Sequence, residues 1–167
     1  MVVPENILKK IMLVCAAFAG GFIIILVLAL LTELSGIPLL MAPFGASCVL
    51  TCAVPESPFA HPKNIICGYT IAALIGFVLL RFVGSSPLSL ALGVGFTIAV
   101  MMLSKTIHPP AGSLPIIIIL GDFDEYFMLF PVFSGALILC MVSFLLNHGV
   151  FRRIRKAAAS KTCKEDT

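Results

Sequence analysis

The chain has 167 residues, of which 60% are hydrophobic and only 11% are charged, and its formal net charge is +3. Soluble domains are about 45–50% apolar and about 25% charged, and a chain of this size cannot hide so much apolar surface from water. These values exclude a disordered chain, which needs low hydrophobicity and high charge, and a soluble enzyme domain. They predict an all-α integral membrane protein in contact with a lipid bilayer.

The spacing of the charges predicts four long transmembrane helices. Between residues 11 and 151 the charged residues are Glu33, Glu56, Lys63, Arg81, Lys105, Asp122, Asp124 and Glu125. They leave six uncharged runs, and a spanning helix needs about 20 apolar residues, within a range of about 17–25. The runs that meet this length without a break are residues 11–32, 64–80, 82–104 and 126–151.

The second run, residues 34–55, is broken by a proline. Pro43 favours a helix that starts near Phe44 and disfavours one that continues through it. The helical part is therefore expected at residues 44–54. Such a helix is about 15 Å long, half of a hydrocarbon core about 30 Å thick.

The fifth run, residues 106–121, is broken in the same way. Pro109 and Pro110 fix a helix start, so the helical part is expected at residues 111–120. It is also about 15 Å long. The chain therefore has two half-helices, each preceded by an extended approach segment.

The two broken segments resemble each other. PFGAS at residues 43–47 aligns with PPAGS at residues 109–113, and each broken segment lies between two long helices. We therefore expect a single transmembrane domain, residues 1–151, made of two inverted repeats of three segments, about 7–80 and 82–151. Paired segments interrupted by Gly or Pro at matching positions of two halves indicate a transport site.

The chemistry of a helix start inside a membrane suits a small anion or a polar neutral molecule. The first four N–H groups of a helix lack partners in that helix, the helix dipole adds roughly half a positive charge there, and lipid cannot satisfy these donors. Gly45 and Gly112 would let a solute approach the backbone, and Ser47 and Ser113 would donate hydroxyl groups. The candidate substrate-binding residues are Pro43, Phe44, Gly45, Ala46, Ser47, His108, Pro109, Pro110, Ala111, Gly112 and Ser113.

His108 has two interpretations. Its pKa lies near physiological pH in the ordinary case, so it suits a proton carrier or an anion partner. Alternatively it caps the end of the preceding helix or donates a hydrogen bond to a carbonyl that the break leaves free.

The loop charges bear on orientation. Positive charge in short loops favours the cytoplasmic side. If the broken segments cross the membrane, the chain crosses six times and Lys63 and Lys105 lie inside. If they re-enter on the same side, the chain crosses four times and Arg81 lies inside. Two residues against one favour six crossings. Lys63 and Lys105 are either attractive to anions at the mouth of the site or markers of topology, and Asn64 is expected to cap the third helix.

Residues 152–167 form a basic tail, which we expect on the cytoplasmic side together with the N-terminus, in the inner (plasma) membrane of the cell. No CxxC or His/Cys ligand spacing occurs, so no metal site is expected. We also expect no cofactor and no nucleic-acid partner. A chain this small is expected to form a homo-oligomer, with Gly20 and Gly21 as a candidate contact.

The segment HPPAGS at residues 108–113 resembles the signature of the HPP family of small integral membrane proteins. The stretch at residues 42–68 is similar to a second part of that family's pattern, with PFGAS, then SP, then PKN before the next helix. The sequence departs from the family pattern at Cys67 and Tyr69, where Gly and His are common. Members are usually described with four membrane segments, and some are associated with nitrite transport.

The residues and the resemblance together predict a transporter or channel for a small inorganic anion, most of all nitrite, held between two opposed half-helices. A pore for a neutral small solute is the alternative within transport. A membrane-embedded enzyme is disfavoured because His108 with Ser47 or Ser113 would lack an orienting acid, so no catalytic residue is expected. A subunit of a larger complex without transport activity also stays open.

Overall fold

The structure is a computed structural model that describes residues 5–121, 123, 126–149, 151 and 154. Within this part of the chain all regular elements are helical. The α-helices are α1 (Glu5–Ser35), α2 (Ala42–Ala53), α3 (Pro62–Phe82), α4 (Pro87–Leu103), α5 (Leu114–Gly121) and α6 (Ser134–His148). The short elements are the 3₁₀ helices η1 (Pro58–Ala60) and η2 (Pro109–Ser113) and the π-helical η3 (Met128–Phe133).

Within the described residues, three helices are long and apolar enough to cross a membrane: Ile7–Ser35 in α1, Pro62–Phe82 in α3, and Met128–His148 in η3 and α6. The fourth predicted long helix is α4, with 17 residues, which is among the shorter apolar helices. The proposed tail at 152–167 lies outside the described residues apart from Ile154, and so do Asp122, Asp124 and Glu125.

The two broken segments form where the prolines predict them. α2 has 12 residues and follows extended backbone at Met41, with Pro43 in its first turn. The second break holds η2 and then α5, which has 8 residues, after extended backbone at His108. The prolines lack an N–H and fix φ, so they are accepted only in a first turn. Short helices thus form in both predicted segments, but α2 covers residues 42–53 rather than 44–54, and α5 covers residues 114–121 rather than 111–120 because residues 109–113 form a 3₁₀ helix.

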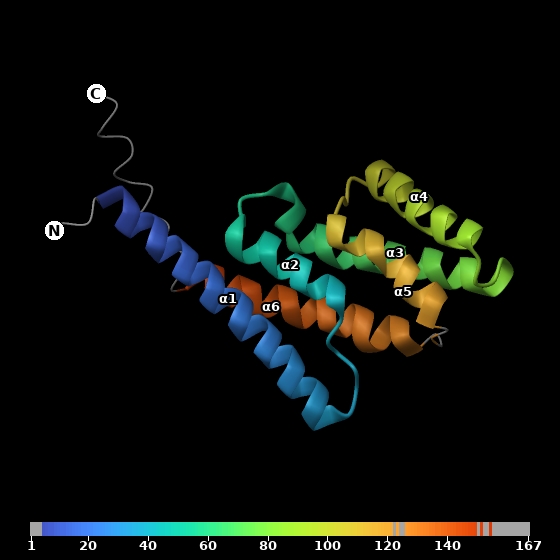
Figure 1. Cartoon of the computed structure of the whole chain (residues 1–167), viewed down its shortest axis with the longest axis horizontal. Coiled ribbons are helices and arrows are strands. Elements are labelled where there is room, and N and C mark those ends of the chain that lie inside the picture. The colour runs from blue at the N-terminus through green and yellow to red at the C-terminus, as the bar shows by residue number, and fades with distance from the viewer. Residues whose placement is uncertain (1–4, 122, 124–125, 150, 152–153, 155–167) are drawn as a thin grey trace.

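Successive helices run in alternating directions (Figure 1). α1, α3 and α5 run broadly one way, and α2, α4 and α6 run the other. α2 and α5 both begin near the middle of the molecule and diverge from there. α1 packs along α2 and against α6, α4 packs along α5 and against α3, α2 packs on α6, and α5 packs on α3.

Glycines in α1, α3, α4 and α6 leave room for side chains of the two broken segments to pack closely. A Cβ on Gly135 of α6 would overlap the ring of Phe44, and one on Gly68 of α3 would come 2.9 Å from the Cβ of His108. Gly93 of α4 meets Pro115 in the same way, and Gly20 of α1 meets Cys52. Gly20 is therefore occupied within the chain, which removes it from the proposed oligomer contact.

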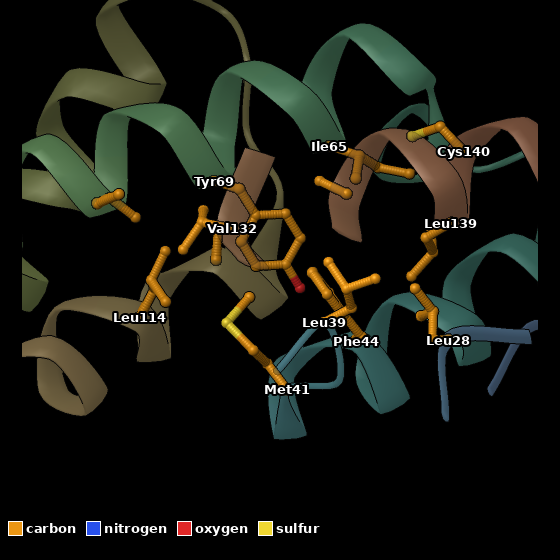
Figure 2. Close-up of a cluster of buried hydrophobic side chains, with 14 of the residues drawn as sticks. Leu28, Leu39, Met41, Phe44, Ile65, Tyr69, Leu114, Val132, Leu139 and Cys140 are labelled. Atoms are coloured by element: carbon orange, nitrogen blue, oxygen red, sulfur yellow. The ribbon is translucent and has the colours of Figure 1, made fainter. Parts of the chain in front are cut away.

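The core lies where α2, α3 and α6 meet the start of α5. Figure 2 shows Tyr69 reaching from α3 into a cluster that includes Phe44 and Val132. Tyr69, Phe44 and Val132 are fully buried. The outer faces of the helices stay apolar and exposed, as a lipid-facing surface requires.

Candidate functional site

Three buried polar side chains meet in the middle of the molecule. The Ser47 hydroxyl of α2 lies 2.8 Å from Nε2 of His108 and 2.8 Å from the hydroxyl of Tyr69 of α3. All three residues have no exposed surface. Nδ1 of His108 lies 2.9 Å from the main-chain oxygen of Phe59 in η1. The two broken segments are therefore joined by a direct side-chain hydrogen bond, and the structure brings Ser47 and His108 together as a shared site requires.

The partners of His108 fix the direction of these bonds when its imidazole is neutral. A carbonyl oxygen can only accept, so Nδ1 carries the proton and donates to Phe59. Nε2 then accepts from the Ser47 hydroxyl. The hydrogen of Ser47 is thereby used, so Tyr69 donates to Ser47 Oγ. The cluster is a directed chain from Tyr69 to the carbonyl of Phe59.

Local structure explains how His108 reaches this place. Its backbone is extended because two prolines follow it, and Gly68 leaves room for its Cβ. Its ring packs edge-on against the ring of Tyr69, with centroids 5.2 Å apart. The ring of Phe44 also packs edge-on against Tyr69, with centroids 5.2 Å apart. His108 does bond a carbonyl, but that carbonyl belongs to η1 and not to its own broken segment or to the helix before it, and its other ring nitrogen bonds Ser47 of the other broken segment.

Several predicted site residues lie elsewhere. Gly45 and Ala46 are exposed on another face of α2 from Ser47, and Gly45 lines an apolar groove beside α1. Ser113 is exposed, and its hydroxyl donates to the main-chain oxygen of Pro110. Gly112 is half-buried and borders open space. Consecutive residues of an α-helix project about 100° apart around the helix axis. Residues next to Ser47 in the sequence therefore lie on other faces of α2.

The main-chain donors at the two starts are fewer than predicted. Pro43, Pro109 and Pro110 have no N–H. The N–H of Phe44 donates to Met41, and that of Ala111 donates to His108. The prolines that create the starts thus remove part of the expected donor set, so side chains supply the polarity of this site.

The charged and capping residues also differ from the prediction. Lys63 and Lys105 are exposed, and Lys105 has a left-handed backbone with φ of 55° in the turn after α4. The expectation that Asn64 caps α3 is wrong. His61 is the N-cap, and its side chain accepts from the N–H of Lys63, because the helix starts at Pro62. The Asn64 amide donates to the main-chain oxygen of Pro58 and holds η1 against α3.

Sequence reasoning missed a second polar group, between α2 and α6. The hydroxyl of Ser143 donates to that of Thr51 at 3.2 Å, and the Asn147 amide donates to the main-chain oxygen of Thr51 at 3.0 Å. These residues lie 92 and 96 positions apart, so no local pattern links them. Isolated Ser, Thr and Asn residues in apolar helices commonly donate hydrogen bonds to backbone groups of the same helix, so they do not by themselves indicate a contact between helices. Tyr69 was marked only by its departure from the family pattern.

The apolar helices, the two broken segments and their buried polar contact together define an integral membrane protein with a polar site inside a helix bundle. The chain belongs to the HPP family. Its residues 7–156 match the family described as "HPP, transmembrane region", which confirms the resemblance seen in the sequence.

Two curated relatives are transmembrane proteins of Dictyostelium discoideum. The chain is 32% identical to one over 150 residues, which is 83% of this chain and 51% of that protein. It is 32% identical to the other over 152 residues, which is 84% of this chain and 48% of that protein. The chain thus spans about half the length of these relatives. No solved structure matches it.

Proposed function

We propose that this chain is a transporter or channel for a small inorganic anion, and that the solute is bound where α2 and η2 meet. The observation that carries the proposal is the buried hydrogen bond between Ser47 and His108. Polar side chains inside a membrane protein are costly and commonly mark solute or proton pathways. Here they join two interrupted segments from the two halves of the chain, which is the arrangement of many transport sites.

The helix packing supports the inverted repeat as part of this proposal. Exchanging α1, α2 and α3 for α4, α5 and α6 turns each main contact into another: α1 with α2 becomes α4 with α5, α1 with α6 becomes α4 with α3, and α2 with α6 becomes α5 with α3. The exchanged helices run in opposite directions (Figure 1). Phe44 of α2 packs at Gly135 of α6, and His108 at the start of η2 packs at Gly68 of α3, so each broken segment meets a glycine of the corresponding long helix, although these residues are not at aligned positions of the two halves.

The polar cluster has the chemistry for a hydrogen-bonding solute. A solute that separates Ser47 from His108 would gain the Ser47 hydroxyl group as a donor, and Tyr69, which donates to Ser47 Oγ, would strengthen it. A protonated His108 would add a second donor, at Nε2, and a positive charge. Nitrite is the first candidate because it is small and accepts hydrogen bonds, and because the family resemblance implies it.

Flux into proteoliposomes tests the proposal. Nitrite uptake should exceed that of empty vesicles, and Ser47→Ala and His108→Ala should each reduce it about tenfold, as expected for the loss of a hydrogen bond worth about 1.4 kcal/mol. Thr70→Val is the control, because Thr70 follows Tyr69 but its hydroxyl donates to Ile66 within the same helix. Absence of flux for nitrite, nitrate, formate, chloride and bicarbonate alike would refute it.

A pore for a neutral small solute is the second candidate, and one observation favours it. Among the described residues no Lys, Arg, Asp or Glu is buried. The cluster therefore carries no fixed charge when His108 is neutral. Glycerol or urea flux that ignores the membrane potential, without anion flux, would favour this function.

We further propose that the Ser47–His108 pair is not catalytic. The ring nitrogen Nδ1 faces a neutral carbonyl rather than a carboxylate, so nothing would stabilise an imidazolium as the acid of a triad does. We also propose that the membrane is the plasma membrane. Both termini are proposed to be cytoplasmic, because Lys and Arg are in excess in residues 152–167. The chain is proposed to act as a homo-oligomer.

A further inference from the structure

A cavity with several polar side chains in an otherwise apolar lining lies at one end of the bundle, apart from the predicted site residues. Its volume is about 550 Å³, and its walls come from the end of α2, η1, the start of α3 and the end of α6. Its rim includes the exposed residues Glu56, His61 and His148. Two other cavities, of about 310 and 470 Å³, are lined almost wholly by apolar residues, as grooves facing lipid would be.

The floor of this cavity carries hydrogen-bonding groups. Thr51 and Ser143 are buried there and bonded to each other, and Asn147 lies beside them. A solute that entered would meet two hydroxyl groups and an amide. The carboxylate of Glu56 at the rim is the one group of the lining that would oppose an anion.

On α2 and α3 the lining of the cavity lies one helical turn from a residue of the buried cluster, and on α6 it lies one turn from a buried core residue. Thr51, Ile65 and Cys140 line the cavity, and the residues four positions further inward on the same helices are Ser47, Tyr69 and Ala136. Four residues of a helix span about 6 Å along its axis. The cavity and the Ser47–His108 contact thus lie at successive levels along α2 and α3, about one helical turn apart.

We propose that this cavity is a water-filled vestibule that admits small hydrogen-bond-accepting solutes to the Ser47–His108 site. The contact between Thr51 and Ser143 closes the vestibule from that site, and parting α6 from α2 opens it. The proposal rests on the proposed function and adds the route, the face and the gate. The vestibule lies on the face where α2 ends and α3 begins.

Cysteine labelling tests this placement. Ser143→Cys puts a thiol of nearly the same size on the floor, and Ser134→Cys, nine positions earlier on α6, does not line the cavity. In sealed proteoliposomes with inserted protein of known orientation, a membrane-impermeant methanethiosulfonate is added to one side, and peptide mass spectrometry locates the modified cysteine. We expect Cys at 143 to react from one side only, and about tenfold or more faster than Cys at 134, as water access requires.

The flux readout separates the two proposals. Modification at 143 should block nitrite flux, and reduction with dithiothreitol should restore it. Reaction at 143 no faster than at 134, or full flux after complete modification, would overturn the vestibule while leaving transport intact. No flux from the wild-type protein would overturn the proposed function, and with it the vestibule's role. Asn147→Cys provides a second floor position if Ser143→Cys fails to give a monodisperse protein.

Discussion

At the residue scale, His108 has a partner at each ring nitrogen, and the two bonds do different work. Nδ1 holds the ring to η1 through the carbonyl of Phe59, and Nε2 links it to Ser47 of α2. Losing one partner of a buried hydrogen bond costs about 1–3 kcal/mol because the other group is left without a partner. The two contacts can therefore be separated by substitution.

His108→Asn should separate anchoring from solute binding. The Asn amide nitrogen takes the place of Nδ1 and keeps the bond to Phe59, whereas nothing replaces Nε2. We expect a stability loss of about 1 kcal/mol, but a drop in nitrite flux of about tenfold. His108→Ala should lose about 2–4 kcal/mol as well as flux, since it also leaves a cavity. Thermal unfolding in detergent and proteoliposome flux measure the two effects, and wild-type flux in His108→Asn would contradict this role of Nε2.

Gly68→Ala should disturb the site through His108. Its Cβ would lie 2.9 Å from the Cβ of His108, which is too close for an unchanged backbone. We expect a loss of about 1–3 kcal/mol, as for other overpacked positions, together with reduced flux. Gly95→Ala is the matched control, because its Cβ meets nothing within 4 Å, and should be neutral or stabilising by up to about 1 kcal/mol. Equal effects of the two substitutions would contradict this explanation.

At the element scale, each broken segment is held by a helix of the other half. α2 rests on α6 at Gly135, and η2 rests on α3 at Gly68. Small residues at helix contacts allow close approach where burial in lipid gives little driving force. The position of each half-helix is thus set by packing across the halves, and motion of α6 would carry the contact with α2.

Gly135→Ala should be destabilising and partly rescued by a smaller residue at 44. The added Cβ would overlap the ring of Phe44 and lie 2.9 Å from the main-chain oxygen of Leu39. Phe44→Leu frees the first contact but not the second. We expect a coupling of about 0.5–3 kcal/mol between the substitutions in a double-mutant cycle measured by thermal unfolding. Strict additivity of the two effects would show that α2 does not rest on α6 at this point.

The sequence allowed the broken elements to be predicted well, and their contacts less so. Pro43, Pro109 and Pro110 fix where a helix can start through a local steric rule, so the two starts followed directly. Which side of a half-helix faces inward depends on distant partners, so Gly45 and Ser113 were assigned to a site that they do not reach. Ser47 and His108 were both assigned to the site because the two broken segments were expected to face each other, but their hydrogen bond was not predicted. Tyr69 was not assigned to the site, because it lies on a helix that carries no break.

At the scale of the whole molecule, the alternating helix directions separate the loops into two faces (Figure 1). Lys63 follows the start of α3 and Lys105 follows the end of α4, so both belong to the face where α1 begins. Arg81 near the end of α3 belongs to the opposite face. α2 and α5 are short, but the extended segments before them carry the chain from one face of the molecule to the helix start, so the loops still alternate between the two faces.

Labelling of single introduced cysteines should report two faces. Lys63→Cys and Lys105→Cys should react with a membrane-impermeant maleimide from the same side of sealed vesicles, and Arg81→Cys should react only from the other. All three positions are exposed, so access is decided by the membrane rather than by burial. Peptide mass spectrometry distinguishes these sites from the native cysteines. If Lys63→Cys and Lys105→Cys react only from outside intact cells while Arg81→Cys reacts from inside, six crossings and a cytoplasmic N-terminus cannot both be right. If Lys63→Cys and Lys105→Cys face the cytoplasm, as the excess of positive charge on that face requires, the vestibule beside His61 opens to the cytoplasm as well.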